Sequence, residues 1–464
     1  PFSAGGTLAM VGTALGPHVY GRGVVCGDPV SYFVHGLINN PSAFVLGRPG
    51  LGKSSLVRHM LIQLPDKDII PLVLSDLKGE YVQLVRGALQ GQVIAPGRGR
   101  DHINPMDKGP LADRLADLPE ELRAAAIADM EGRRQNTVAG LCELALGRRL
   151  EAHEQNVLNR AIVECDETVP GTPVIGDLLA YVQSAPTTLM GIAQARGDEG
   201  RYADRVEHLV DALLALAGEG VFGDVFSEAT TTPLQMHSPA VFDLSDVDAM
   251  DQALQAGLQL VCWSYGSAAV TAAKYLADAG LAPRRTYCMV MDELWRALRA
   301  ADFMVDRVDE ITRLNRTLNL AQVLITHTMN DLKLTTQAAT DKAFGFVARS
   351  EIVFLGGLAP GEMGNLQQAF AMSSKEEGWV TSWSTPGETN PHTGKTDPPA
   401  GRGKFLLKIG KQVGVPFVVQ LVEAERVLNE TNVNWQDTID AVTGVSLAKS
   451  PATPSDLSDP AGQV

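Results

Sequence analysis

Residues 42–55, SAFVLGRPGLGKSS, decide the fold of this chain. The apolar run before Gly47 predicts a buried strand, and the apolar spacing after Ser54 predicts a helix that reaches about Gln63. Between them, residues 47–54 fit the pattern GxxxxGK[ST] in full. Glycines let such a loop turn tightly and direct its backbone N–H groups, with the positive end of the following helix, at phosphate oxygens. The stretch therefore predicts a nucleotide-binding P-loop.

We expect the whole loop to contact a nucleotide. Lys53 would reach the β- and γ-phosphates, and the hydroxyl of Ser54 would ligate Mg²⁺. The predicted nucleotide-binding residues are Gly47, Arg48, Pro49, Gly50, Leu51, Gly52, Lys53, Ser54 and Ser55. The predicted cofactors are accordingly ATP and Mg²⁺.

Strand and helix patterns alternate after the loop. IIPLVLSD (69–76) and QVIAP (92–96) are predicted strands, separated by a helical period in DLKGEYVQLVRGAL (76–89). This βαβαβ alternation is typical of a parallel sheet, and hence of an α/β fold. Further strands are predicted within residues 240–247, 286–294, 321–328, 351–357, 404–411 and 415–422, and a long helix or helix pair within 253–280.

An acidic pair follows the apolar strand at 286–291. We expect this strand beside the P-loop strand, where Asp292 would hold Mg²⁺ through water and Glu293 would polarise the attacking water. An acid after the metal-binding aspartate favours hydrolysis. The alternative interpretation is a strand that ends in a solvated acidic turn.

The strand at 321–328 ends in three polar residues, of which His327 is a candidate sensor of the γ-phosphate. A histidine that only caps the strand is the alternative. Arg316, shortly before this strand, is a candidate to neutralise transition-state charge across a subunit interface, unless it lies on a solvated helix face. Arg349 and Arg402 are weaker candidates for the same role.

Composition excludes some classes of protein. The formal net charge of −15 argues against nucleic-acid binding over the whole surface, although a local basic channel stays open. The five cysteines are scattered and form no CxxC, which argues against a disulfide framework or structural zinc. No run of 18 apolar residues occurs, so we expect no stable membrane insertion of this segment.

Several blocks together resemble one known family. They are the P-loop, the block DLKGEY (76–81), the turn INPMD (103–107) and the DE-x-W signature formed by Asp292, Glu293 and Trp295. The set resembles the large ATPase of conjugative type IV secretion systems, the VirB/TraC-like group of the HerA/FtsK superfamily. The resemblance runs from about Gly21 to Gln436.

The resemblance implies a RecA-like P-loop core with a mostly parallel sheet and an inserted all-α subdomain. It implies a Mg²⁺-dependent ATP hydrolase that powers assembly of a secretion channel or pilus and passage of DNA or protein through it. The implied partners are further copies of this chain in a homo-hexamer and the membrane components of the channel. The implied location is cytoplasmic and peripheral, at the inner face of the bacterial cell membrane.

Some positions match the family and others depart from it. Asp76 and Lys78 match the D-x-KG block, and Asp76 either orders the metal shell or caps the following helix. Arg316 matches the arginine-finger region by its spacing to the sensor strand. The family usually has Gln at the sensor position, where this chain has His327. The turn-rich segment 384–403 has no counterpart that we recognise.

The predicted organisation has five parts. They are a lead-in with short strands (1–40), the first half of the core (41–110), the all-α insertion (111–225), the second half of the core (226–440) and a flexible tail (441–464). In the lead-in, HVYGRGVV (18–25) and VSYFVHG (30–36) are the β-prone pieces.

Two other functions stay open. One is a coupling protein or FtsK-like pump that threads DNA through a basic central channel. The other is a nucleotide-gated assembly scaffold with little hydrolysis, against which Glu293 weighs, since a scaffold needs no water-activating acid.

Overall fold

The computed structural model describes residues 10–218, 220, 222–248, 250–312, 315–387 and 398–428, without the side chains of residues 311, 315 and 316. The chain divides into two compact units, Pro1–Leu421 and Val422–Val464. The described part of the second unit holds α14 (Glu423–Leu428). The predicted tail at 441–464 lies outside the described residues, and so does half of the turn-rich segment 384–403.

Within the described residues, nine strands form the central sheet of the first unit, in the order β11-β10-β9-β3-β8-β7-β4-β6-β5. The strands from β9 to β5 in that order pair in parallel, and β10 and β11 add an antiparallel edge. The bounds are β3 Ser42–Leu46, β4 Ile69–Asp76, β5 Gln92–Ile94, β6 Ala240–Asp243, β7 Thr286–Met291, β8 Leu320–Ile325, β9 Ile352–Leu355, β10 Lys404–Ile409 and β11 Val415–Val418. The predicted α/β fold with a mostly parallel sheet is confirmed.

The expectation that the acidic strand lies beside the P-loop strand is wrong. β8 lies between the two, because Val45 of β3 pairs with Ile325 of β8, and Leu324 of β8 pairs with Met291 of β7. A parallel strand is reached through a crossover connection, which can place it at any position in the sheet. The order of strands in the sequence therefore does not determine their order in space.

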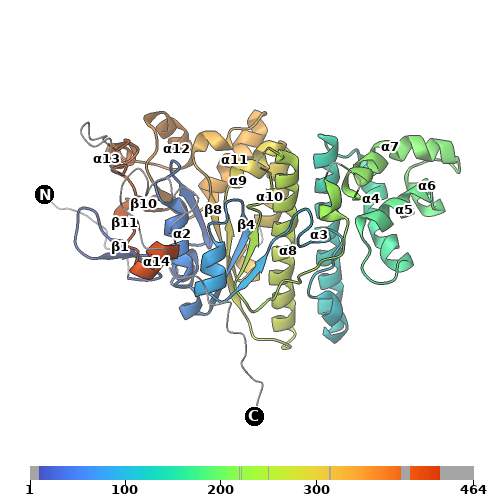
Figure 1. The fold of residues 1–464 in the computed structure, drawn as a ribbon, viewed down its shortest axis with the longest axis horizontal. Helices are drawn as coiled ribbons and strands as arrows, with labels where there is room; N and C mark the ends of the chain where they lie inside the picture. The colour runs from blue at the N-terminus through green and yellow to red at the C-terminus, as the bar shows by residue number, and fades with distance from the viewer. Residues whose placement is uncertain are drawn as a thin grey trace, which may run out of the picture. The chain divides into compact units, whose positions relative to one another are not determined.

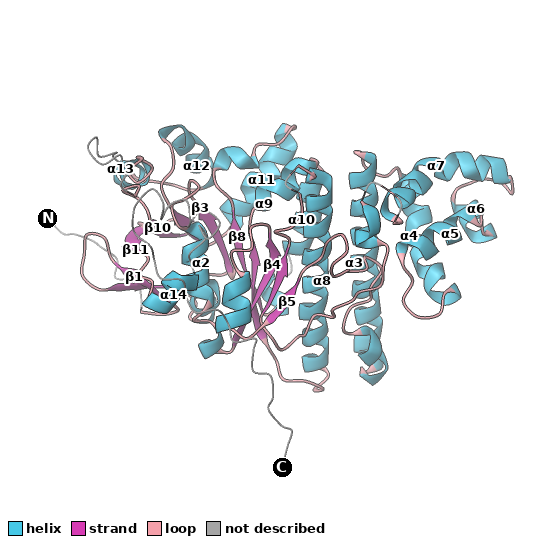
Figure 2. Ribbon diagram, viewed as in Figure 1, coloured by secondary structure: helices cyan, strands magenta, loops and turns pink. Residues whose placement is uncertain are grey.

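Helices fill the chain between β5 and β6, which are neighbours in the sheet. The described residues there form helices, turns and loops, as Figure 2 shows around α4 to α7. The helices are α3 Glu120–Leu146, α4 Ala152–Thr168, α5 Ile175–Gln183, α6 Thr187–Ile192 and α7 Glu199–Leu216. This stretch has the character of the predicted all-α insertion, whereas the division of the chain into domains stays a prediction.

One long helix joins the helical stretch to the sheet. α8 (Gln252–Asp278) is a single helix, and it contacts β4 on one side and α3 on the other (Figure 1). Twenty of its residues are buried, which is typical of a helix between two packed layers. The other helices are α1 Pro29–Val34, α2 Lys53–Leu61, α9 Leu294–Ala300, α10 Met304–Thr312, α11 Gln337–Arg349, α12 Met363–Ala369 and α13 Ser374–Ser382.

Two local predictions need correction. The segment VSYFVHG lies mostly in α1, because Asp28 caps the Ser31 N–H at 2.7 Å and Pro29 favours a first helical position. Residues 76–89 have the spacing of a helix, but the structure forms only a short π-helix there, Leu84–Ala88. The strand prediction for HVYGRGVV is partly confirmed, since β1 (Ala14–Pro17) pairs with β2 (Val24–Cys26).

Among the described residues, none of the helices combines the length and apolar character that a membrane span requires.

Candidate functional site

The P-loop follows β3 and leads into α2 at the carboxyl end of the parallel sheet. Gly50 and Gly52 have φ angles of 79° and 96°, in the left-handed region that favours glycine, and Gly52 is the N-cap of α2. The loop is tied to its surroundings at both ends. The Gly47 N–H donates to the His327 carbonyl at 2.9 Å, and the Gly403 N–H donates to the Leu51 carbonyl at 2.9 Å. The turn thus has the backbone form that presents N–H groups to an anion.

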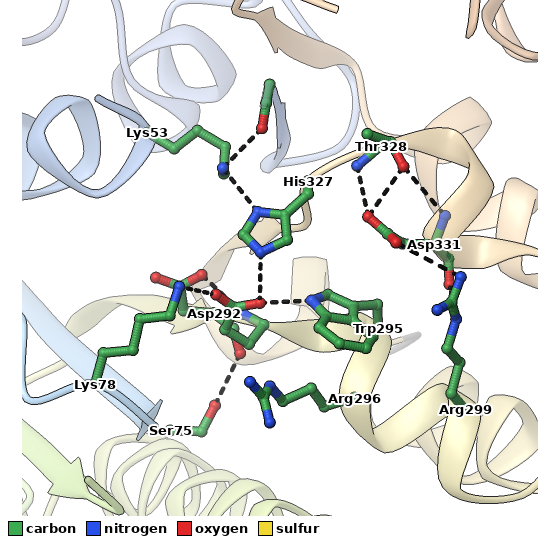
Figure 3. A network of polar contacts seen from close by, with 12 residues as sticks. Lys53, Ser75, Lys78, Asp292, Trp295, Arg296, Arg299, His327, Thr328 and Asp331 are labelled. Atoms are coloured by element: carbon green, nitrogen blue, oxygen red, sulfur yellow. Dashed lines mark hydrogen bonds and ion pairs between the residues drawn. The ribbon is translucent and has the colours of Figure 1, made fainter. Parts of the chain in front are cut away.

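Lys53 is the first residue of α2, and its ammonium group is buried. Its Nζ donates to the Gly47 carbonyl at 2.7 Å and to Nδ1 of His327 at 2.9 Å (Figure 3). Burial lowers the pKa of Lys53 to about 8, although the charges of Asp292 and Glu293 oppose this shift. Lys53 is therefore a buried amine beside the P-loop and close to two carboxylates. There it lies where the negative charge of a phosphate bound by the loop would reach it.

Glu293 collects three contacts from three different segments. Lys78 pairs with Oε1, while Nε2 of His327 lies 3.2 Å from Oε2 and Nε1 of Trp295 donates to Oε2 at 2.5 Å. Burial alone would raise the pKa of Glu293, but the contacts with His327 and Lys78 hold it well below its usual range. The carboxylate is therefore charged, and both of its oxygens accept.

The backbone of Glu293 is unusual as well. Its φ of 52° places a residue with a full side chain in the left-handed region, where it forms the N-cap of α9. Such a conformation costs on the order of 1 kcal/mol or more and persists only where surrounding structure holds it. The turn separates the two acids, since Asp292 and Glu293 contact different partners.

Among the described residues, no basic side chain is a hydrogen-bond partner of Asp292. Its carboxylate accepts from the Tyr81 hydroxyl at 2.9 Å and from the Glu293 N–H at 2.8 Å. Burial, followed by the neighbouring charge of Glu293, raises the pKa of Asp292 to about 7. A buried carboxylate of this kind fits a divalent cation, because added positive charge would stabilise its ionised form.

The oxygen donors near the loop also suit magnesium in kind. The hydroxyl of Ser54 and the carboxylate of Asp292 are hard ligands, which Mg²⁺ prefers. The described residues contain no group of three or more His, Cys, Asp or Glu side chains arranged to hold a metal. Mg²⁺ commonly binds through one or two protein oxygens together with water and phosphate, so this sparse donor set fits it.

Asp76 caps the turn after β4. Its side chain accepts backbone hydrogen bonds from Lys78 at 3.3 Å, Glu80 at 3.0 Å and Tyr81 at 2.7 Å. Burial nevertheless raises its pKa to about 6. Asp76 thus caps a turn and not the start of the helix that the sequence predicted, and this turn carries Lys78 to Glu293 and Tyr81 to Asp292.

The arginine candidates lie in three different settings. The backbone of Arg316 belongs to a short helical turn, Asn315–Leu318, but its side chain is outside the described residues. Arg349 is engaged with Asp309 at 2.7 Å. Arg402 is exposed on the segment whose Gly403 contacts the P-loop. Of the other predicted binding residues, Arg48 and Pro49 lie in the P-loop, and Ser54 and Ser55 lie in the first turn of α2. Their contact with a nucleotide stays a prediction.

The structure thus brings Lys53, Asp292, Glu293 and His327 together, although their strands are far apart in sequence. Sequence reasoning missed the contacts of Tyr81 and Trp295 with the two acids. The blocks KGEY and DE-x-W contain both residues, and that was the available signal. Thr328, which follows His327, instead bonds to Asp331 and caps a separate turn.

A glycine-rich loop between a central strand and a helix, facing acids on a nearby strand, defines the class of P-loop NTPases. No family model and no curated protein matches the sequence. Among solved structures, the chain is similar to VirB4 of Thermoanaerobacter pseudethanolicus, with a TM-score of 0.65 and 17% identity, over 90% of this chain and 99% of that chain. It also matches the bacterial conjugative coupling protein TrwBdeltaN70 in complex with sulphate, with a TM-score of 0.49 and 12% identity, over 82% and 86%. The likeness to VirB4 shows that this chain has the fold of that protein.

Proposed function

We propose that this chain is a Mg²⁺-dependent ATPase that powers assembly of a conjugative type IV secretion system and transfer of substrate through it. The observation that carries the ATPase proposal is the contact series from Lys53 through His327 to Glu293. The series joins the P-loop to a carboxylate suited to activate water. The secretion role is supported by the blocks that resemble the VirB/TraC-like group and by the fold of VirB4.

Each residue has a distinct task in this proposal. The N–H groups of residues 50–55 and the ammonium of Lys53 bind the phosphates, since Pro49 has no N–H and the Gly47 and Arg48 N–H groups donate to the His327 and Gly357 carbonyls. Ser54 and Asp292 hold Mg²⁺, which neutralises charge on the phosphate oxygens. Glu293 polarises the attacking water, and its low pKa keeps it ionised at neutral pH.

His327 is the proposed sensor because it contacts both the phosphate-binding lysine and the carboxylate that acts on water. Its Nδ1 contacts Lys53, and its Nε2 contacts Glu293. When phosphate draws the ammonium of Lys53 away, the imidazole loses one partner, and its hold on Glu293 changes. Both oxygens of Glu293 are engaged by Lys78, His327 and Trp295, so water activation requires one of these contacts to open.

The proposal extends to assembly. A ring of identical subunits, a hexamer as in the VirB/TraC-like group, would let Arg316 of one copy reach the nucleotide of the next. An arginine supplied in this way contributes on the order of 10³–10⁵ in rate. The ring would act at the cytoplasmic face of the membrane, bound to membrane components of the channel.

The testing experiment measures Mg²⁺-dependent ATP hydrolysis over a wide range of protein concentration. Glu293→Gln is compared with Glu207→Gln, which alters an exposed glutamate on α7. We expect specific activity to rise with concentration, to be lost in Glu293→Gln and to be retained in Glu207→Gln. Arg316→Ala should lower activity and leave ATP binding intact.

Other outcomes would favour the alternatives. ATP binding without hydrolysis at every concentration would support the nucleotide-gated scaffold. Hydrolysis that depends on added DNA, together with directional movement along it, would support the DNA pump. Failure to bind ATP would contradict the proposed function as a whole.

A further inference from the structure

A cavity of about 320 Å³ lies between α3, α8 and α10, lined by residues from these three helices and by Lys108, Leu111 and Leu318. Much of its wall is apolar, from side chains such as Leu260, Ala268 and Ala272. A Cβ atom built on Gly132 would meet no atom within 4 Å, so this position borders open space. The volume lies at the lower end of the range of small-molecule sites, about 300–1,000 Å³.

Arg133 lines this cavity, and both of its partners are neutral. Its Nη2 donates to the Asp107 carbonyl at 2.8 Å, and its Nη1 lies 3.5 Å from the hydroxyl of Ser264. Among the described residues, no carboxylate lies within ion-pair distance of Arg133. The side chain is half-buried, and desolvation lowers its pKa to about 10, although the nearby charge of Asp107 opposes this shift.

The other charged side chains of the wall are already engaged. The contacts are Arg307–Glu143 at 3.1 Å, Arg307–Glu310 at 3.7 Å, Lys108–Asp166 at 3.3 Å and Tyr275–Asp129 at 2.6 Å. Arg133 differs from these groups, because no carboxylate among the described residues bonds to its guanidinium, and the charge of Asp107 acts on it only through space.

A hydroxyl in the same wall is also unsatisfied. The Oγ of Ser267 is buried and has no hydrogen-bond partner among the described residues, although Thr137 and Ser264 in the same wall bond to each other at 2.6 Å. A buried polar atom left without a hydrogen bond destabilises the folded state. A guanidinium with spare donors and an unsatisfied hydroxyl beside an apolar wall together fit a ligand that has both an anionic group and an apolar part.

We propose that this cavity binds a small carboxylic acid with an apolar body. The carboxylate would accept from the guanidinium of Arg133, whose planar donors suit two parallel hydrogen bonds. The hydrocarbon part would lie against the alanine and leucine side chains of α8. Of the nearby acidic residues, Glu310 pairs with Arg307, Asp129 accepts from Tyr275, and Asp107 accepts from the Thr230 hydroxyl and the Gly109 N–H.

The position of the cavity gives such a ligand a structural effect. α3 belongs to the helical stretch between β5 and β6, α8 contacts β4, and α10 precedes the segment that contains Arg316. A ligand in the cavity touches all three helices at once. Because it binds only the folded chain, it raises the free energy of unfolding.

The test uses octanoate and its uncharged analogue 1-octanol with the full chain, by calorimetry and thermal unfolding. We expect one octanoate per chain, bound at least 10-fold more tightly than octanol, and an increase in Tm. In Arg133→Gln, octanoate affinity should fall at least 10-fold, while octanol affinity is unchanged. Arg201→Gln, which changes an exposed arginine on α7, should bind as the wild type does.

A second variant separates binding from folding. Gly132→Leu fills the open space, and Leu is a better helix former than Gly, so the variant should fold with an equal or higher Tm. It should bind neither probe. The proposal is overturned if octanoate fails to bind the wild type, or if Arg133→Gln or Gly132→Leu binds it as tightly as the wild type does.

Discussion

The nucleotide site and the cavity between α3 and α8 hold positive charge in different ways. At the nucleotide site, Lys78 pairs with Glu293, and Lys53 bonds to a carbonyl and to His327. In the cavity, Arg133 bonds to a carbonyl and lies near a hydroxyl, and no carboxylate among the described residues lies within ion-pair distance of it. At the nucleotide site, the charged side chains already pair with one another, so bound phosphate must rearrange these pairs. In the cavity, the guanidinium of Arg133 has donors left over, so it can bind an anion from solution.

The same contrast occurs between neighbours on one helix. Arg134 is fully buried and donates to Asp166 through both terminal nitrogens, at 3.0 and 2.7 Å. Arg133, one residue earlier, faces the cavity instead. The helix turns adjacent side chains about 100° apart, so one arginine joins α4 and the other does not.

The largest expected effect comes from breaking the satisfied arginine. Asp166→Asn leaves the charge of Arg134 buried without its counter-ion, which should lower the free energy of unfolding by about 3–5 kcal/mol. Arg133→Gln should change it by less than about 1 kcal/mol, because no ion pair is lost. Urea denaturation of both variants measures the difference. Equal losses would mean that Arg133 is as well paired as Arg134.

The next effect separates the two sites. Lys53→Ala removes the ammonium from the P-loop and should lower ATP hydrolysis on the order of 10²–10³-fold. Binding of octanoate in the cavity should be unchanged, and Lys67→Ala, at an exposed lysine, should alter neither property. Steady-state kinetics and calorimetry provide the two measurements. Loss of octanoate binding in Lys53→Ala would show that the sites are not independent.

A smaller effect is expected at the edge of the nucleotide site. Trp295→Phe keeps the ring but removes the donor to Glu293, so the carboxylate is less well positioned. We expect kcat to fall about 10-fold with KM nearly unchanged, consistent with a lost hydrogen bond to a charged group. Trp379→Phe, which alters a ring stacked on Tyr20, is the control. A change in KM alone would contradict a positioning role.

The smallest effect concerns pH and a fully satisfied carboxylate of the helical stretch. Burial raises the pKa of Glu164, but hydrogen bonds from Thr188, Tyr181 and Arg160 outweigh it and lower the pKa. A lowered pKa means that the stabilisation is present at neutral pH and is lost as the pH falls through the folded-state value. The difference in unfolding free energy between wild type and Glu164→Gln should therefore shrink as the pH falls below about 4. A difference that grows on acidification would contradict this sign.

The fold was largely predictable because its signals are local. The P-loop pattern, the apolar runs and the helical spacing each depend on neighbouring residues, and the strands and long helices appear near the predicted positions. Apart from the position of the acidic strand in the sheet, the failures were also local. In α1, the cap of Asp28 and the position of Pro29 outweighed the β-prone side chains of VSYFVHG.

The site was predictable in its members and not in its contacts. Lys53, Asp292 and Glu293 follow from motif spacing, and His327 follows from its place at the end of an apolar strand. That His327 bridges Lys53 and Glu293 depends on β8 lying between β3 and β7. No linear spacing encodes that order, since crossover connections set it.

By itself, the sequence determined the chemical groups that the chain carries, a phosphate-binding loop and an acidic pair. It also determined the fold class, with a long helical stretch between strands of a mostly parallel sheet. The tertiary structure alone decided which charges meet. It placed Lys78 on Glu293, left Asp292 with a tyrosine, and turned Arg133 to a cavity while Arg134 paired with Asp166. The physical reason is that motifs depend on residues close in the chain, whereas pairing and burial depend on segments that meet only after folding.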